Sequence, residues 1–199
     1  MAAPAPLILA SASPRRRDLM EEMGYLFRVV TVPVEEAMPP HLTVRETVLM
    51  NARRKGTAVA NLHPGACVVA ADTLVALEGK PLGKPASLDE ARRMLRELSG
   101  RTHQVFSGVW IEHRDAGKLG AFIEVSEVRF RELTPDEIEQ YFQLVHVLDK
   151  AGAYAAQDDP IGLIKEIQGS RSNVIGLPME RLGAMLERRG FVGRELKSV

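Results

Sequence analysis

Along the first half of the chain, short apolar runs alternate with segments that open on helix-capping residues, and this alternation is the strongest constraint on the fold. The predicted strands are residues 7–10, 27–34 and 67–77, the last being the most apolar of them. The predicted helices begin at Ser13-Pro14, in the capping box Thr43–Glu46 and in the capping box Ser87–Glu90, and end near Gly24, Leu62 and Gly100. Strands that alternate with helices predict an α/β fold.

The second half adds a predicted antiparallel hairpin, so the expected sheet is mixed. Residues 104–112 and 122–131 have strand-like composition and flank the turn 114–118. The remaining predicted elements are a helix from the capping box Thr134–Glu137, late strands at 161–167 and 174–177, and a terminal helix opened by Pro178. Buried helix faces are expected at Leu19, Met20 and Met23, at Ala91, Met94, Leu95 and Leu98, and at Met179, Leu182 and Leu186.

Size, charge and cysteine content narrow the class of protein. The 199 residues suffice for one sizeable core, expected over residues 7–190 between a flexible N-terminus (1–6) and a C-terminal tail (191–199). Basic and acidic residues number 26 each, so no nucleic-acid partner is expected. The single cysteine, Cys67, excludes an intramolecular disulfide and a Cys-rich zinc site. Without a secretory signal or the ~20 apolar residues of a membrane helix, a cytoplasmic protein with no membrane partner is expected.

A basic segment follows the first predicted strand at a helix start. Ser11 and Ser13-Pro14 lead into Arg15, Arg16 and Arg17. Arginines in a first helical turn oppose the helix dipole, at a cost of ~0.3–1 kcal/mol each, and a phosphate bound there would reverse that cost. A solvated basic turn with a serine cap explains the segment equally well.

A lone carboxylate, Asp72, interrupts the most apolar strand. An ionised carboxylate among apolar residues needs a partner, a hydrogen bond or a metal, and such a site can supply a general base or a metal ligand. The alternative is that Asp72 ends the strand and caps a turn through Thr73. The functional interpretation is favoured, since ligands bind at the carboxyl edge of α/β sheets.

Further charged residues are ambiguous taken singly. Lys55 falls on the apolar face of its helix, where a lysine that extends to the rim is the simpler interpretation. Glu36 and Lys84 lie in predicted loops, and Asp149 precedes a turn of small residues, so surface charge would explain each of them. Taken together with the arginines, they supply the mixture of cations and carboxylates that a polyphosphate–metal site uses.

These residues occur in segments that resemble the Maf family of nucleotide pyrophosphatases, in family order along nearly the whole chain. The matching segments are Leu7 to Arg16, Ala71-Asp72-Thr73, Gly83-Lys84-Pro85, Leu98 to His103, Asp149 to Tyr154 and Gly176-Leu177-Pro178. The resemblance implies a single Maf-like catalytic domain with a mixed twisted sheet in two lobes and a cleft between them, like inosine triphosphate pyrophosphatases. It also implies a cytoplasmic enzyme, often a homodimer, that cleaves a nucleoside triphosphate to the monophosphate and pyrophosphate.

The resemblance also implies the roles of individual residues. Asp72 would accept the proton of the attacking water, and Lys55 and Lys84 would assist catalysis. Glu36 and Asp72 would hold Mg²⁺ or Mn²⁺. The phosphates would bind Ser11, Arg15 and Arg16.

Three positions separate the subclasses of the family. Arg15, Thr73 and Gln157 look like the subclass that hydrolyses dTTP and UTP, with Gln157 reading the base. Asp158 departs from the common family pattern beside Gln157 and bears on nucleotide preference. Two alternatives stay open, a purine triphosphate pyrophosphatase of the ITP type and a non-catalytic nucleotide-sensing regulator of septum formation.

Overall fold

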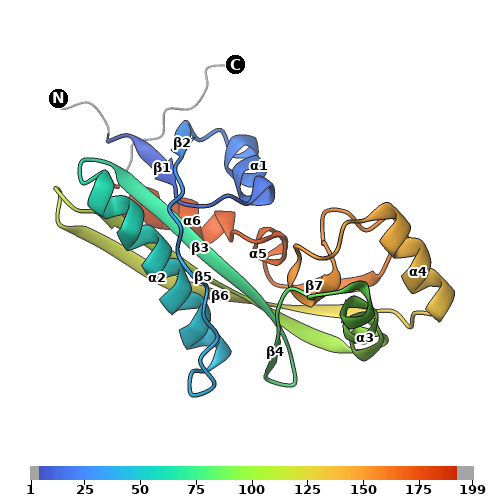
Figure 1. Ribbon diagram of the computed structural model, residues 1–199. Helices are drawn as coiled ribbons and strands as arrows, with labels where there is room; N and C mark the ends of the chain where they lie inside the picture. The colour runs from blue at the N-terminus through green and yellow to red at the C-terminus, as the bar shows by residue number, and fades with distance from the viewer. Residues whose placement is uncertain (1–4, 192–199) are drawn as a thin grey trace.

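A seven-stranded mixed sheet forms the centre of the molecule, in the order β2-β1-β3-β5-β6-β7 with β4 paired to β3 (Figure 1). The computed structural model describes residues 5–191, so the predicted termini 1–6 and 191–199 lie almost wholly outside the described residues. Strand β1 is parallel to β2 and to β3, and the other pairings are antiparallel. The strands are β1 (Leu7–Leu9), β2 (Phe27–Val29), β3 (Cys67–Leu77), β4 (Lys80–Leu82), β5 (Thr102–His113), β6 (Lys118–Phe130) and β7 (Ile164–Gln168).

The five predicted helices begin where their capping residues placed them, and one further short helix was not predicted. They are α1 (Pro14–Glu22), α2 (Val44–Leu62), α3 (Leu88–Leu98), α4 (Pro135–Leu144), α5 (Arg171–Ile175) and α6 (Met179–Arg188), with a 3₁₀ turn, η1 (Ala151–Ala153). The boxes at Thr43 and Thr134 form completely. In the third box, the Ser87 hydroxyl accepts from the amide of Glu90 as expected. The return bond is absent, because the Glu90 carboxylate accepts from the amide of Ala86 instead of that of Ser87.

Three local predictions were wrong. Residues 174–177 do not form a strand, because the Ser170 side chain caps the short helix α5 and Gly176, at φ +135°, ends it. Met23 is 42% exposed, since α1 stops one residue before it. Strand β2 ends at Val29 instead of residue 34, and the chain beyond it turns toward a cavity that it helps to line.

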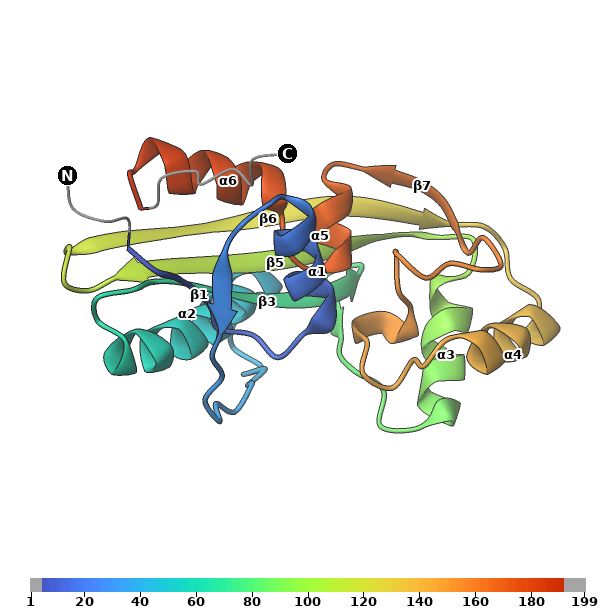
Figure 2. The ribbon, with the colours of Figure 1, turned by 90° about the horizontal axis from the view of Figure 1, so that it is seen from above.

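Helices cover both faces of the first half of the sheet. Helix α2 lies along one face, while α1 and α6 lie on the other (Figure 2). Side chains of β3 alternate between the two faces, so Val68 and Ala70 pack against α2 and Val69 and Ala71 pack toward α6. Gly108 lets α2 approach β5 closely, because a Cβ at this position would lie 2.6 Å from the backbone of α2.

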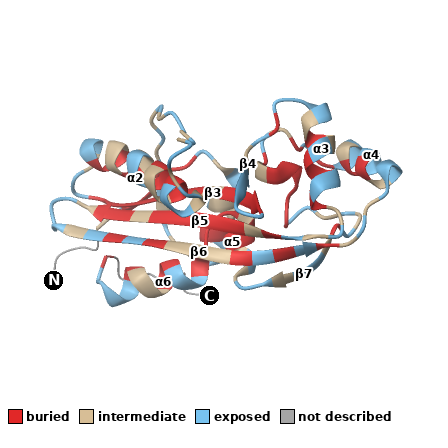
Figure 3. Cartoon of the chain, turned by 90° about the horizontal axis from the view of Figure 1, so that it is seen from below, coloured by how far each residue is buried: buried red, intermediate tan, exposed pale blue. Residues whose placement is uncertain are grey.

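A second core lies at the other end of the sheet. There α3, α4, η1 and β7 enclose the buried side chains of Leu95, Phe130 and Tyr141. The long strands β3 and β5 are buried along most of their length and join the two ends (Figure 3). The expectation of two lobes on one mixed sheet is confirmed. No helix among residues 5–191 is both long and apolar enough to cross a bilayer.

Strand β3 has an open edge between the two lobes. On this edge β1 pairs with β3 only as far as Val69, which lies opposite Leu9. Pairing with β4 begins at Val75, which lies opposite Leu82. Within the described residues, positions 71–74 therefore have no ladder partner on that side. The backbone of this stretch is unpaired on that side, and Asp72 and Thr73 line a cavity there.

Candidate functional site

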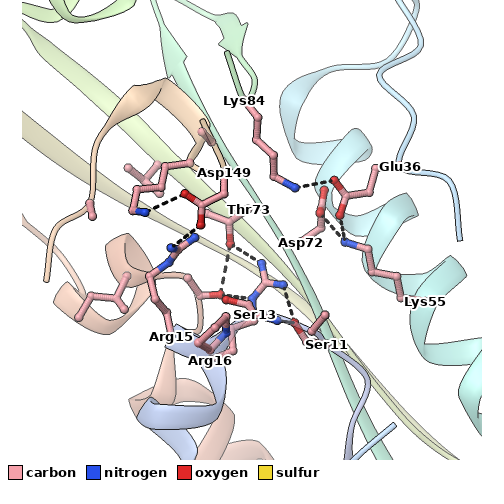
Figure 4. A pocket seen from close by; sticks show the side chains of 18 of the residues that line it. Ser11, Ser13, Arg15, Arg16, Glu36, Lys55, Asp72, Thr73, Lys84 and Asp149 are labelled. Atoms are coloured by element: carbon pink, nitrogen blue, oxygen red, sulfur yellow. Dashed lines mark hydrogen bonds and ion pairs between the residues drawn. The ribbon is translucent and has the colours of Figure 1, made fainter. Parts of the chain in front are cut away.

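A cavity of about 420 Å³ lies at the open edge of β3 and takes its walls from both lobes. One wall comes from the junction of β1 and α1, residues 31–36 and α2. The other comes from residues 149–156 and from the end of α5. Ser11, Arg15, Arg16, Glu36, Lys55, Asp72, Thr73, Lys84 and Asp149 all line the cavity (Figure 4). The fold thus brings together nearly all the candidate residues that the sequence singled out.

Two carboxylates and two lysines form the centre of the cavity (Figure 4). Lys55 Nζ lies 2.6 Å from Glu36 Oε1 and 2.8 Å from Asp72 Oδ1, and Lys84 Nζ lies 3.5 Å from Glu36 Oε2. The Asp72 side chain is buried, and that of Lys55 is only 15% exposed. The interpretation of Lys55 as a rim lysine is therefore wrong, since its ammonium group bridges two acidic side chains inside the cavity.

Glu36 is held ionised by its neighbours. Burial by itself raises the pKa of this carboxyl. The hydrogen bond and charge of Lys55 and the charges of Lys84 and Arg16 outweigh that effect, so the pKa lies below its ordinary value. Glu36 is consequently a carboxylate at neutral pH and faces the cavity as a ligand for cations.

Asn51 is a buried amide in contact with this cluster. Its Nδ2 donates to Asp72 Oδ2 at 3.0 Å and to the carbonyl of Ala37 at 3.1 Å, and its Oδ1 accepts from the amide of Ala37 at 3.1 Å. The sequence reasoning missed this residue. A polar side chain four residues before Lys55, between Val48 and Ala52 on the buried stripe, was the available signal.

Arg16 is fixed on the opposite side of β3. Its guanidinium donates to the carbonyl of Gly176 at 2.8 Å, to Ser11 Oγ at 3.1 Å and to Thr73 Oγ1 at 3.1 Å (Figure 4). Burial lowers the pKa of Arg16 from its ordinary value, against the raising effect of nearby Asp72 and Glu36. Thr73 in turn lies 2.8 Å from Ser107 Oγ, a member of this network that the sequence did not reveal. The cation is thus presented to the cavity in one orientation.

The start of α1 keeps features of an anion site. Ser13 occupies the cap position before Pro14, but its side chain makes no capping hydrogen bond, and the first turn holds no acidic residue.

Arg15 lies 3.5 Å from Asp149, which also pairs with Lys150 at 2.8 Å. Burial raises the pKa of Asp149, but the hydrogen bond and charge of Lys150, followed by the charge of Arg15, lower it below its ordinary value.

Gln157 is the one candidate residue that the fold leaves outside the cavity wall. It is exposed, as is Asp158, whereas the preceding residues Tyr154, Ala155 and Ala156 line the cavity. The Tyr154 hydroxyl lies 2.8 Å from His103 Nε2, which anchors the segment in the second core. The role of Gln157 in reading a base stays a prediction.

The donor set fits a divalent cation that is shared with a polyphosphate. Residues 5–191 hold no group of three or more His, Cys, Asp or Glu side chains that could by themselves bind a metal. Glu36 and Asp72 nevertheless face one common point, now taken by the Lys55 ammonium. Two carboxylates with oxygens from phosphate and water are the ligands that Mg²⁺ usually receives in phosphoryl-transfer sites.

Comparisons with known proteins agree with this site and fold. The family model described as Maf-like protein matches residues 6–189. The dTTP/UTP pyrophosphatase of Akkermansia muciniphila is 45% identical over 186 residues, which cover 94% of this chain and 97% of the relative. The dTTP/UTP pyrophosphatase of Halalkalibacterium halodurans is 44% identical over 189 residues, 95% of this chain and 98% of the relative.

Solved structures resemble the chain in fold. The Staphylococcus aureus Ham1 protein aligns with a TM-score of 0.55 and 17% identity, over 92% of this chain and 99% of that chain. A HAM1 protein from Coxiella burnetii aligns with a TM-score of 0.52 and 16% identity, over 92% and 99%. At these identities the likeness bears on architecture alone, and it confirms the expected fold.

Proposed function

Because the chain belongs to the Maf family, we propose that it hydrolyses dTTP and UTP to the nucleoside monophosphate and pyrophosphate. The observation that carries the proposal is the buried Asp72 carboxylate, which faces a cavity lined by Arg15, Arg16, Lys55 and Lys84. Relatives named dTTP/UTP pyrophosphatase match nearly the full length of the chain, which supports the choice of substrate.

In the reaction that we propose, a water oxygen attacks the α-phosphorus and the bond to the α–β bridging oxygen breaks. Asp72 takes the proton of that water, and pyrophosphate leaves with the bridging oxygen. Asp72 is buried, and Asn51 and Lys55 each hold one of its oxygens, so its carboxylate has a fixed position. A general base needs such a position, because it must lie within hydrogen-bond reach of the proton that it removes. Its Oδ1 lies 2.8 Å from Lys55 Nζ, an ion pair that a substrate can open.

The cations would bind and neutralise the phosphates. Arg16 is already oriented by three hydrogen bonds, so it loses little conformational freedom when a phosphate binds. Arg15 and Lys84 are held only by ion pairs of 3.5 Å, which a phosphate oxygen can replace. Ser11 lines the cavity beside Arg16 and can donate its hydroxyl to a phosphate oxygen.

Glu36 and Asp72 would hold Mg²⁺ or Mn²⁺ together with phosphate oxygens. Such an ion, when bound, supplies positive charge to the triphosphate and its leaving group. Lys55 would then turn from its position between the two carboxylates toward the substrate. The choice of base would depend on Arg15 and Thr73, which line the cavity. It would also depend on Gln157, which directly follows the lining residues 154–156 in the chain.

A panel of nucleoside triphosphates tests the proposal. The purified protein is incubated with dTTP, UTP, dGTP and ITP, with and without Mg²⁺ or Mn²⁺, and pyrophosphate and monophosphate are measured. Preferred release of pyrophosphate from dTTP and UTP is expected. A preference for ITP would favour the purine enzyme, and binding without turnover would favour a nucleotide-sensing regulator. A cytoplasmic location and a homodimer remain predictions.

A further inference from the structure

Asn51 connects Asp72 to the segment that follows Glu36. It is 2% exposed and lies on α2, one helical turn before Lys55. Through Nδ2 it contacts Asp72, and through both ends of its amide it contacts the backbone of Ala37, which directly follows Glu36. A single side chain thus joins the proposed base on β3 to the loop that carries the second carboxylate.

The orientation of the Asn51 amide is determined by its partners. The N–H of Ala37 can only donate, so the group that faces it must be Oδ1. The Nδ2 hydrogens then point to two acceptors, the Ala37 carbonyl and Asp72 Oδ2. A flipped amide would set oxygen against two acceptors and nitrogen against a donor, and would lose all three hydrogen bonds.

Each oxygen of Asp72 therefore has its own donor from α2. Asn51 holds Oδ2 at 3.0 Å and Lys55 holds Oδ1 at 2.8 Å. Lys55 has a long side chain that can turn to a phosphate, whereas Asn51 is short and held at both ends. We propose that Asn51 is a positioning residue that keeps Asp72 Oδ2 occupied, so that the carboxylate is held in one orientation toward the cavity, and that also sets the distance between Asp72 and the Glu36 loop.

This inference rests on the proposed function, in which Asp72 is the base. Without the Asn51 amide, Asp72 Oδ2 and the backbone of Ala37 lose the side chain that joins them, so the carboxylate is no longer held in one orientation. Lys55 also contacts Asp72, Arg16 lies near it, and Lys84 contacts Glu36. Substitution of Asn51 leaves all of these in the chain.

The test compares Asn51→Ala and Asn51→Asp with a matched control on the same helix, Thr57→Val. Thr57 donates a hydrogen bond to Glu112 on β5, and neither residue lines the cavity, so Thr57→Val also deletes one side-chain hydrogen bond of α2. Pyrophosphate release from dTTP is measured over a range of substrate concentrations, so that kcat and KM are separated. Thermal unfolding is recorded for each variant.

For Asn51→Ala we expect kcat to fall by about 10- to 100-fold, the usual effect of removing a supporting partner, with KM changed much less. Asn51→Asp has nearly the same shape and keeps an acceptor for Ala37, but its second oxygen faces Asp72 Oδ2 and the Ala37 carbonyl, so kcat should fall at least as far. Thr57→Val should keep the wild-type kcat and KM.

Folded Asn51 variants with the wild-type kcat would overturn the inference while the proposed function stands. A rise in KM alone would also overturn it, since that would make Asn51 a part of substrate binding. Wild-type protein that releases no pyrophosphate from any triphosphate would overturn both the proposed function and this role.

Discussion

Asp72 and Thr73 are consecutive residues of β3 that point to opposite faces of the sheet, and both side chains reach the same cavity. Asp72 Oδ1 lies 2.8 Å from Lys55 on α2, and Thr73 Oγ1 lies 3.1 Å from Arg16 on α1. In the interior of a sheet the two would be separated by neighbouring strands. Because the edge of β3 is open between β1 and β4, one ligand at that edge can contact the base on one face and a cation on the other.

Asp72→Asn should abolish most turnover while leaving the fold intact. The substitution is nearly isosteric, but the amide cannot accept the proton of the attacking water, so kcat should fall by about 10²- to 10⁴-fold. Pyrophosphate release is measured beside a circular-dichroism melt. Near-normal turnover in a folded variant would remove Asp72 from the role of base.

Lys84→Ala and Lys55→Ala should differ in stability. The Lys84 side chain is 57% exposed and pairs loosely with Glu36, so its loss should lower kcat/KM with a change in unfolding free energy of less than about 0.5 kcal/mol. Lys55 is enclosed and bridges two carboxylates, so its loss should lower activity and also cost about 1–3 kcal/mol. Denaturant unfolding and initial rates check both outcomes. Equal stability of the two variants would contradict the bridging role of Lys55.

Gln157→Glu should lower the turnover of dTTP and UTP more than that of dGTP. Thymine and uracil present two carbonyl acceptors that need an amide donor, whereas a carboxylate can accept from the N–H groups of guanine. Gln143→Glu, at an exposed position of α4, serves as the control for an added surface charge. An equal loss with all three nucleotides would show that Gln157 supports the site without reading the base.

His103 should make the folding stability depend on pH. Burial lowers the pKa of its ring from 6.5 to about 4, so the unfolded chain binds a proton in this interval that the folded protein does not. Stability should therefore decrease as the pH falls from about 6.5 to about 4, and the contribution of His103 over that interval is about 3 kcal/mol.

His103→Gln checks this dependence. Glutamine does not titrate and can still form a hydrogen bond with the Tyr154 hydroxyl. Denaturant unfolding of both proteins is measured at pH 7 and at pH 4.5. The wild type should lose more stability than the variant between these two values, and parallel losses would show that His103 contributes nothing.

Local signals in the sequence were sufficient to predict most of the elements. The boxes at Thr43 and Thr134, Pro at the first helical position and the apolar run 67–77 each act within a few residues, and their elements form where expected. The strand prediction for residues 174–177 failed because an apolar run this short suits a strand and a buried helix equally well. The cap at Ser170 decided in favour of the helix.

The sequence by itself determined which residue types were available: a carboxylate inside an apolar strand, arginines at a helix start and lysines at unusual positions. Only the tertiary structure decided how they are paired. Helical spacing allowed Lys55 to lie at the rim or in the site, and the contact with Asp72 forms because α2 packs across β3. The role of Asn51 likewise depends on partners 14 and 21 residues away along the chain. Such distant pairs meet through strand register and helix packing, which local sequence patterns do not specify.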